Sequence, residues 1–288
     1  LRIDSYIVKR FLSYSRAYRP SFCRSTTAMK KTSTMRSPAQ HVSVSTRPAG
    51  AMRFALTVAC LGWLVHAGFA QATPGTGGGE IVPTHPLNDT GTTWSGAYPS
   101  GNATTCDPSH PAGQDCRYGR DAAAGQLTKI GGGSAGFDFT KISNSGAELP
   151  ASAALGTGPG DWACTRDNVT KLIWEVKTTS GLRSQDHTYT WYNSDNITNG
   201  GSAGTTSGGS CHQTGRCDTE KYVEDVNSTG LCGATGWRMP TVGELTSIVD
   251  QSRTSPAIDT TYFPNTPSLY FWSGSPYAGD SNGVWGVH

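Results

Sequence analysis

Six cysteines that follow an apolar, leader-like segment constrain the fold of this chain more than any other feature. They are Cys106, Cys116, Cys164, Cys211, Cys217 and Cys232. An even number of cysteines in an exported chain indicates disulfide bonds, although sequence alone does not give their pairing. Proximity in the sequence favours pairing Cys106 with Cys116 and Cys211 with Cys217. The remaining pair, Cys164 with Cys232, would close the longest loop and stabilise the domain most.

The leader-like segment spans residues 52–72. Met52 and Arg53 form a short positive region, residues 54–67 are mostly apolar, and Ala70-Gln71-Ala72 has the pattern of a cleavage site. This arrangement predicts a signal peptide rather than a retained anchor, because the apolar stretch is shorter than the roughly 20 residues of a membrane-spanning helix. We therefore expect a secreted, periplasmic or cell-surface protein without a transmembrane span in its mature form.

Residues 1–51 differ from the rest in charge. They begin with Leu, and Asp4 is their one acidic residue against ten Lys and Arg. We interpret them as non-native upstream translation and expect disorder; a basic transit segment is the rival interpretation.

The mature part of the chain is acidic. The whole chain has a formal net charge of +2, but residues 73–288 hold twelve Lys and Arg against twenty Asp and Glu, a net charge of −8. An acidic domain repels phosphate backbones and lacks the basic stripe that nucleic-acid binding requires. This excludes DNA and RNA as expected partners.

Composition divides residues 73–288 into three parts. Residues 73–105 are rich in Gly, Thr and Pro and predict a tether. Residues 106–160 form a loop-rich extension with a strand predicted at 136–142, where apolar positions alternate. Residues 161–288 are denser in apolar residues and form the expected domain.

The expected domain combines strands with two short helices. β-branched and aromatic residues predict strands at 172–176, 189–192, 270–272 and 284–287. Asp218 and Gly230 are the expected start and stop of the first helix. Thr241 and Glu244 form a capping box for a second helix, whose apolar stripe runs to Val249. This order predicts an α+β fold.

Four stretches of this domain carry a family resemblance. They are Cys164-Thr165-Arg166-Asp167-Asn168-Val169-Thr170, Leu172-Ile173-Trp174-Glu175, Trp237-Arg238-Met239-Pro240-Thr241 with Glu244-Leu245, and Phe271-Trp272-Ser273. In order and spacing they resemble the Lcl C-terminal domain family over about residues 160–288. The resemblance implies a C-type lectin-like fold, with small mixed or antiparallel sheets, two short helices and long irregular loops. It also implies a secreted or surface-attached bacterial protein, and one collagen-like adhesin of the family is linked to sulfated glycosaminoglycans.

Two departures from the family pattern carry expectations. Lys171 stands where the family has Gly, in a turn that would need a positive φ, which would strain the turn by about 1 kcal/mol or more. The sequence ends at Trp285-Gly286-Val287-His288, where similar proteins continue to a closing strand. The resemblance therefore implies a C-terminally incomplete copy with an unpaired sheet edge.

Metal and ligand sites have weak support in the sequence. Cys211, His212 and Cys217 are close together, but they lack the second ligand pair of a zinc site, and we expect no metal. The calcium candidates are Asp186, Asp195, Glu224 and Asp225, and we interpret them as solvated surface acids.

Aromatic and basic residues are the remaining ligand candidates. The tryptophans could stack on sugars, but we expect most of them in the core, because the domain has few Leu and Ile. They are Trp162, Trp174, Trp191, Trp237, Trp272 and Trp285. For Arg238 we favour a structural ion pair. A local basic patch could still bind a sulfated ligand, and its candidates are Arg166, Lys171, Lys177, Arg183, Arg216, Lys221, Arg238 and Arg253.

The sequence points to no catalytic residue and to no cofactor. No histidine of the sequence has a recognisable partner, and no nucleophile paired with a base is apparent. A formylglycine-generating oxidase, which shares a lectin-like fold, is a remote alternative, but Cys217 and Cys232 lack the surrounding pattern of that family. The resemblance and the exported character favour a non-enzymatic recognition domain, with extracellular glycans or surface proteins as partners. The alternative is a structural surface protein or an inactive fragment.

Overall fold

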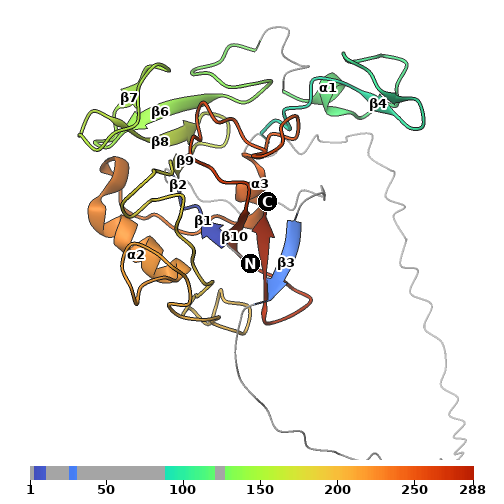
Figure 1. Ribbon diagram of the computed structural model, residues 1–288. Helices are drawn as coiled ribbons and strands as arrows, with labels where there is room; N and C mark the ends of the chain where they lie inside the picture. The colour runs from blue at the N-terminus through green and yellow to red at the C-terminus, as the bar shows by residue number, and fades with distance from the viewer. Residues whose placement is uncertain (1–2, 11–25, 31–87, 121–126) are drawn as a thin grey trace, which may run out of the picture. The chain divides into compact units, whose positions relative to one another are not determined.

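The computed structural model describes residues 3–10, 26–30, 88–120 and 127–288 (Figure 1). The chain divides into two units, Leu1–Ser33 with Pro83–His288, and Thr34–Val82. The second unit lies outside the described residues, as do the expected signal peptide and residues 73–87 of the expected tether. The α+β class expected from the sequence is confirmed for the first unit, which combines small, mostly antiparallel sheets with short helices. No helix of the described part is long and apolar enough to cross a membrane.

A five-stranded sheet has the order β2-β9-β8-β6-β7, with every pair antiparallel. Its strands are β2 (Val8–Arg10), β6 (Phe139–Ser143), β7 (Glu148–Leu149), β8 (Trp162–Asp167) and β9 (Leu172–Glu175). Side chains of successive residues point to opposite faces of a strand. In β9, Leu172 and Trp174 accordingly join one core cluster and Ile173 joins another. The sheet therefore has a core on both faces.

The turn between β8 and β9 has the backbone geometry that the sequence predicts. Lys171 has a φ of +62°, in the left-handed region that favours Gly. The Oδ1 atom of Asp167 accepts the backbone N–H of Val169 at 2.8 Å and that of Thr170 at 3.2 Å. The Lys171 ammonium donates to the Asn168 carbonyl at 2.5 Å. These bonds hold a non-glycine residue in a strained conformation.

A four-stranded sheet has the order β1-β10-β11-β3. It contains β1 (Ile3–Ser5), β3 (Thr26–Lys30), β10 (Tyr270–Pro276) and β11 (Gly283–Val287). β1 runs parallel to β10, whereas β10–β11 and β11–β3 are antiparallel pairs. The strands predicted at 270–272 and 284–287 thus both form. The unpaired edge that we expected beside them is covered by β1 and β3.

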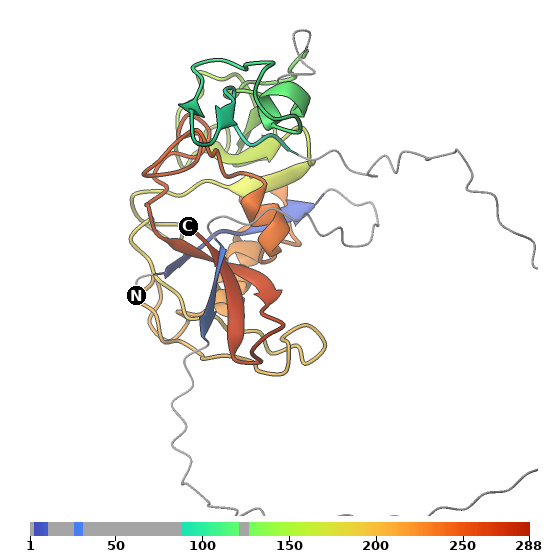
Figure 2. The same cartoon turned by 90° about the vertical axis from the view of Figure 1, so that its right-hand side faces the viewer.

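The N-terminal residues differ most from the sequence-based expectation. Residues 3–10 and 26–30 form strands beside β9, β10 and β11, although we expected residues 1–51 to be disordered (Figures 1 and 2). Tyr6, Ile7 and Val8 are at most 1% exposed. Their β-branched and aromatic side chains suit a buried strand. The charge of the whole 51-residue segment concealed this short apolar run.

The helices begin where the sequence predicts. Helix α2 (Thr219–Thr229) has Asp218 as its N-cap, accepting the Lys221 N–H at 2.9 Å, and ends at Gly230 with φ +63°. Helix α3 (Val242–Thr246) has the predicted capping box of Thr241 and Glu244. It ends earlier than its apolar stripe, which continues into the following loop. A 3₁₀ turn, η1 (Leu231–Gly233), follows α2.

The predicted strand at 189–192 is not a strand in the structure. Thr188, Thr190 and Tyr192 each form only an isolated bridge, to Ser210, Asp218 and Gly204 respectively. These partners belong to loops and to a helix cap, so no continuous ladder can form. The aromatic residues here still fill the core, because Tyr189 and Trp191 are at most 4% exposed.

The extension before residue 160 contributes small elements. It contains the two-stranded pair β4 (Gly96–Ala97) and β5 (Gly101–Asn102), and the short helix α1 (Asp115–Tyr118). The strand predicted at 136–142 is present as β6. Tyr98, beside β4, is fully exposed.

The tryptophans are mainly core residues, as the composition predicts. Five of the six in the C-terminal part are at most 5% exposed, and Trp285 is half-buried. The five are Trp162, Trp174, Trp191, Trp237 and Trp272. Their burial leaves no ring stack available for a sugar among these five residues.

Candidate functional site

Disulfide bonds join three pairs of cysteines within the described residues. Cys164 of β8 is joined to Cys232 of η1 across 68 residues of sequence, and both are nearly inaccessible. The other two bonds close short loops, between Cys106 and Cys116 and between Cys211 and Cys217. The two short-loop pairs are those that proximity in the sequence favours, and Cys164–Cys232 is the pair that then remains.

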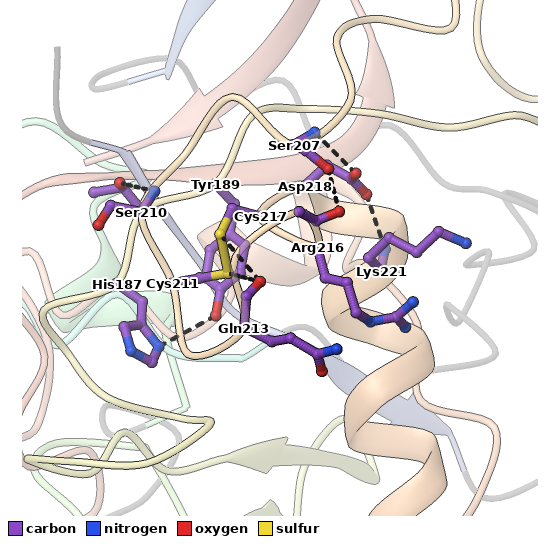
Figure 3. The surroundings of a disulfide bond; sticks show 12 residues. His187, Tyr189, Ser207, Ser210, Cys211, Gln213, Arg216, Cys217, Asp218 and Lys221 are labelled. Atoms are coloured by element: carbon purple, nitrogen blue, oxygen red, sulfur yellow. Dashed lines mark hydrogen bonds between the residues drawn. A yellow bond between two sulfur atoms is a disulfide. The ribbon is translucent and has the colours of Figure 1, made fainter.

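The Cys211–Cys217 disulfide lies beside His187 and Tyr189 (Figure 3). The Nδ1 atom of His187 is 3.4 Å from the Tyr189 hydroxyl and 3.2 Å from the Leu182 carbonyl oxygen, and its ring centroid is 6.3 Å from that of His212. Burial lowers the pKa of His187. Both cysteines are already bonded to each other, so they are not available as the thiolate ligands that a zinc site would need.

The acids considered for calcium serve other partners. Asp195 accepts the backbone N–H of Ile197 at 2.9 Å and the hydroxyl of Thr198 at 2.9 Å. Glu224 and Asp225 both contact Arg216. Within the described residues, no group of three or more His, Cys, Asp or Glu is arranged to hold a metal ion.

Each cationic side chain of residues 160–288 has a partner within the protein. Six contact carboxylates, namely Arg166, Lys177, Arg216, Lys221, Arg238 and Arg253. The other two, Lys171 and Arg183, donate to backbone carbonyls. The basic residues are therefore spread over separate structural contacts and do not form one patch.

The surface beside α2 carries a group of ion pairs between basic and acidic side chains. The Arg216 guanidinium contacts Asp225 at 2.5 Å and Glu224 at 3.1 Å, and the Lys221 ammonium contacts Glu224 at 2.7 Å. Hydrogen bonds to Asp225 and Glu224 raise the pKa of Arg216, and the bond to Lys221 is the first of those that lower the pKa of Glu224. These two cations are thus paired with the two carboxylates and are not free for an anionic ligand.

Arg238 forms the structural ion pair expected from the sequence. Its two terminal nitrogens contact the two oxygens of Glu244 at 2.8 and 2.6 Å. Burial opposes ionisation of Glu244, but the bonds from Arg238 outweigh it and hold the pKa of Glu244 below its ordinary value. Because Glu244 also completes the capping box of α3, this pair fixes the start of that helix.

An apolar pocket of about 420 Å³ lies between α3, the following loop and β10. Its floor consists of buried side chains, namely Tyr6, Leu245, Ile248, Phe271 and Val287. The volume falls in the range of roughly 300–1,000 Å³ that is common for small-molecule sites. A second pocket, of about 190 Å³, lies beside β6 and β7 and is smaller.

The rim of this pocket is polar and exposed. It includes Gln251, Thr254, Ser255 and Ser268, all of them exposed to solvent. Within the described residues, none of these four side chains hydrogen-bonds to the protein. Arg253 is also at the rim, but its guanidinium contacts Asp250 at 2.8 Å and Asp259 at 3.8 Å. An apolar floor with unpaired neutral polar groups above it suits an uncharged ligand that has an apolar face.

No local sequence pattern marks this pocket. Pro256, Pro264 and Pro267 indicated a loop after α3, but the floor of the pocket comes from four separate parts of the chain, including Tyr6. No local pattern records such a long-range assembly. The one available signal was the apolar stripe at Ile248 and Val249, which extends past the end of α3 into the loop.

These features define an α+β domain that is held together by disulfides and carries a neutral pocket. Residues 163–288 match the Lcl C-terminal domain, the family that the sequence motifs resemble. Comparisons with curated proteins and with solved structures find no match.

Proposed function

We propose that this chain is an exported, non-enzymatic recognition protein whose Lcl C-terminal domain binds a neutral glycan in the pocket beside α3. The observation that carries the proposal is the combination of an apolar floor with four exposed, unpaired polar side chains at the rim. A sugar ring presents an apolar C–H face and peripheral hydroxyls, so it matches both parts of this site.

The pairing of the cations favours a neutral over a sulfated ligand. Binding of a polyanion draws on several basic groups that can release their partners. Here each of the eight basic groups of residues 160–288 already contacts a carboxylate or a carbonyl. A sulfate would have to displace these contacts in a domain of negative net charge.

Export is supported by the disulfides. Three disulfides in one chain persist in oxidising compartments outside the cytoplasm. Cleavage after a signal peptide at residues 52–72 would remove Tyr6 from the floor of the pocket, so the export inferred from the disulfides does not rest on that segment. The same bonds favour a non-enzymatic role over an oxidase that depends on reactive cysteines, because Cys217 and Cys232 are bonded to different partners and neither has a free thiol.

A glycan array probed with the full chain tests the proposal. We expect binding to a subset of neutral glycans, and loss of that binding in Ala257→Trp, which places an indole in the pocket. Ser210→Trp, at an exposed position in the loop near the Cys211–Cys217 disulfide, is the matched control and should bind as wild type.

Two results would contradict the proposal. Binding that survives Ala257→Trp with an unchanged glycan profile would remove the pocket from the site. A folded chain that binds no glycan on the array would favour the alternative, a structural surface protein.

A further inference from the structure

The smaller pocket, of about 190 Å³, lies on the edge of β6 that faces away from β8. Along this edge β6 has two separate partners, because Phe139 forms an isolated bridge to Gly132 and the next residues pair with β7. Residues 130–131 line one side of the pocket and residues 148–151 line the other, so it lies between these two partners. It shares no lining residue with the pocket beside α3 and includes none of residues 1–51.

Tyr262 brings a hydroxyl without a partner to this pocket. The residue is 4% exposed, and its ring packs against that of Phe139 with centroids 5.5 Å apart. Its backbone carbonyl accepts the Thr165 hydroxyl at 2.7 Å, so the residue is held on two sides. Within the described residues, the Tyr262 hydroxyl forms no hydrogen bond. A buried polar group of this kind costs free energy unless another molecule satisfies it.

The fold makes room for this hydroxyl. A side-chain carbon at Gly132 would collide with the Tyr262 oxygen, whereas it would lie 3.4 Å from the nearest carbon of the ring. The φ of Gly132 is outside the left-handed region, so its backbone would accept alanine. Glycine is therefore required here by a hydroxyl that the described protein does not use.

The other polar side chains of the pocket are engaged within the protein. The Thr140 hydroxyl accepts from the Asn168 amide at 2.8 Å, and the Lys141 ammonium donates to the Ala153 carbonyl at 2.8 Å. Glu148 forms an ion pair with an arginine of β8. The charges at this pocket are thus paired, and the phenolic hydroxyl remains for a ligand.

The surroundings of the Tyr262 hydroxyl keep it protonated. Burial raises the pKa of Tyr262, and the carboxylates of Asp259 and Asp138 raise it further. The hydroxyl is therefore a hydrogen-bond donor at neutral pH. The same carboxylates disfavour an anion beside it, so the site suits an uncharged molecule that carries an oxygen acceptor.

The walls of the pocket are apolar. Ile130, Leu149 and Pro150 contribute to them, and Ile130 is 66% exposed. The volume is below the range that is common for drug-sized ligands, and it suits a molecule of the size of a single sugar ring. We infer that this pocket is a second glycan site, which binds one neutral sugar unit through its apolar walls and a hydrogen bond from Tyr262. The inference rests on the proposed glycan recognition, but because the two pockets share no residue, either site can fail alone.

The experiment isolates this site in the full chain by blocking the first pocket with Ala257→Trp. Chemical-shift titrations use the methyl glycosides of glucose, galactose, mannose and N-acetylglucosamine. We expect at least one of them to bind the Ala257→Trp protein, and the further change Tyr262→Phe to weaken that binding by about two- to tenfold, the effect of one hydrogen bond. Tyr192→Phe is the matched control, since this half-buried tyrosine also has a hydroxyl without a partner in the described part. It should leave the affinity unchanged.

Thermal unfolding separates a binding role of the hydroxyl from a structural one. Tyr262→Phe should melt no lower than the wild type, because the hydroxyl that it removes has no partner. Gly132→Ala should lower the melting temperature of the wild type, and the loss should largely disappear when Gly132→Ala is combined with Tyr262→Phe. A marked loss of stability in Tyr262→Phe alone would assign the hydroxyl to the fold.

Two binding results would overturn the second site. One is equal affinity of a glycoside for the tyrosine and phenylalanine forms of the Ala257→Trp protein. The other is the absence of binding to that protein at the highest soluble concentration of each glycoside. If the wild-type chain still binds glycans in the latter case, only the second site fails and the proposed function stands.

Discussion

The pocket beside α3 and the surface around α2 use polar residues in opposite ways. At the pocket, Thr254, Ser255 and Ser268 are exposed and neutral, and their side chains form no hydrogen bond to the described protein. On α2, Arg216 and Lys221 are bonded to neighbouring acids. The first region leaves polar groups free for a ligand, whereas the second uses its polar groups within the fold.

The difference teaches that in this acidic domain cations serve structure. A count of basic residues suggested a possible polyanion site, but the contacts of those residues assign them to helix caps, turns and ion pairs. Neutral hydroxyls and amides, which a charge count does not register, are the groups that remain available.

The strongest effect is expected where a cation is buried. Lys177→Met should lower the free energy of unfolding by about 3–5 kcal/mol, because it leaves the Glu175 carboxylate buried without its partner. Lys221→Met removes a cation from the exposed pair on α2 and should leave the melting temperature nearly unchanged. Urea unfolding of both variants measures the difference. Similar losses in the two variants would contradict the structural role assigned to Lys177.

The disulfides should differ with the length of the loop that they close. Replacing Cys164 and Cys232 by Ala should cost about 4 kcal/mol of stability, and replacing Cys211 and Cys217 about 2 kcal/mol, according to the loop-closure entropy. Thermal unfolding under non-reducing conditions compares the two variants. If removal of the Cys211–Cys217 bond proved the more damaging, the loop near α2 would be more important to stability than this account allows.

The pocket rim should affect binding without affecting stability. The double variant Thr254→Ala with Ser268→Ala should weaken binding of a neutral glycan by about tenfold, since each lost hydrogen bond contributes roughly 0.5–1.5 kcal/mol. Thr206→Ala with Ser210→Ala, in the loop near the Cys211–Cys217 disulfide, is the control and should change nothing. Titration calorimetry gives both affinities. Equal affinities for the two double variants would show that the rim does not contact the ligand.

The smallest effect concerns pH. Burial lowers the pKa of His187, and the nearby positive charges of Lys177 and His212 lower it further. The unfolded chain therefore binds the proton more readily than the folded one. Stability should fall as the pH drops below the unfolded value of about 6.5. The fall should be smaller in His187→Gln, measured by urea unfolding between pH 5 and pH 8. An identical pH profile in both proteins would rule out this contribution.

Local signals in the sequence predicted the parts of the fold that depend on neighbouring residues. Asp218, Thr241 and Glu244 marked the starts of α2 and α3, and the family pattern at Lys171 predicted a left-handed turn. These features succeed because a cap or a turn is decided within a few residues. The Cys106–Cys116 and Cys211–Cys217 disulfides were predictable for the same reason, because each joins cysteines that are close in sequence.

Long-range features could not be predicted in this way. β1 pairs with β10 from the other end of the sequence, and Tyr6 lines a pocket together with Ile248 and Phe271. Strand pairing at such separation has no local signature, and the basic residues around Tyr6 concealed its apolar run. At 189–192 the composition predicted a strand that does not form, because the aromatic residues there are buried without a continuous strand pairing.

The salt dependence of binding distinguishes recognition at a neutral pocket from recognition through cations. The full chain should be titrated with its strongest array ligand at about 20 mM and 500 mM salt, where the Debye length falls severalfold. We expect the same affinity at both salt concentrations. If the strongest ligand is sulfated and its affinity falls steeply with added salt, recognition occurs through cations and not at the neutral pocket.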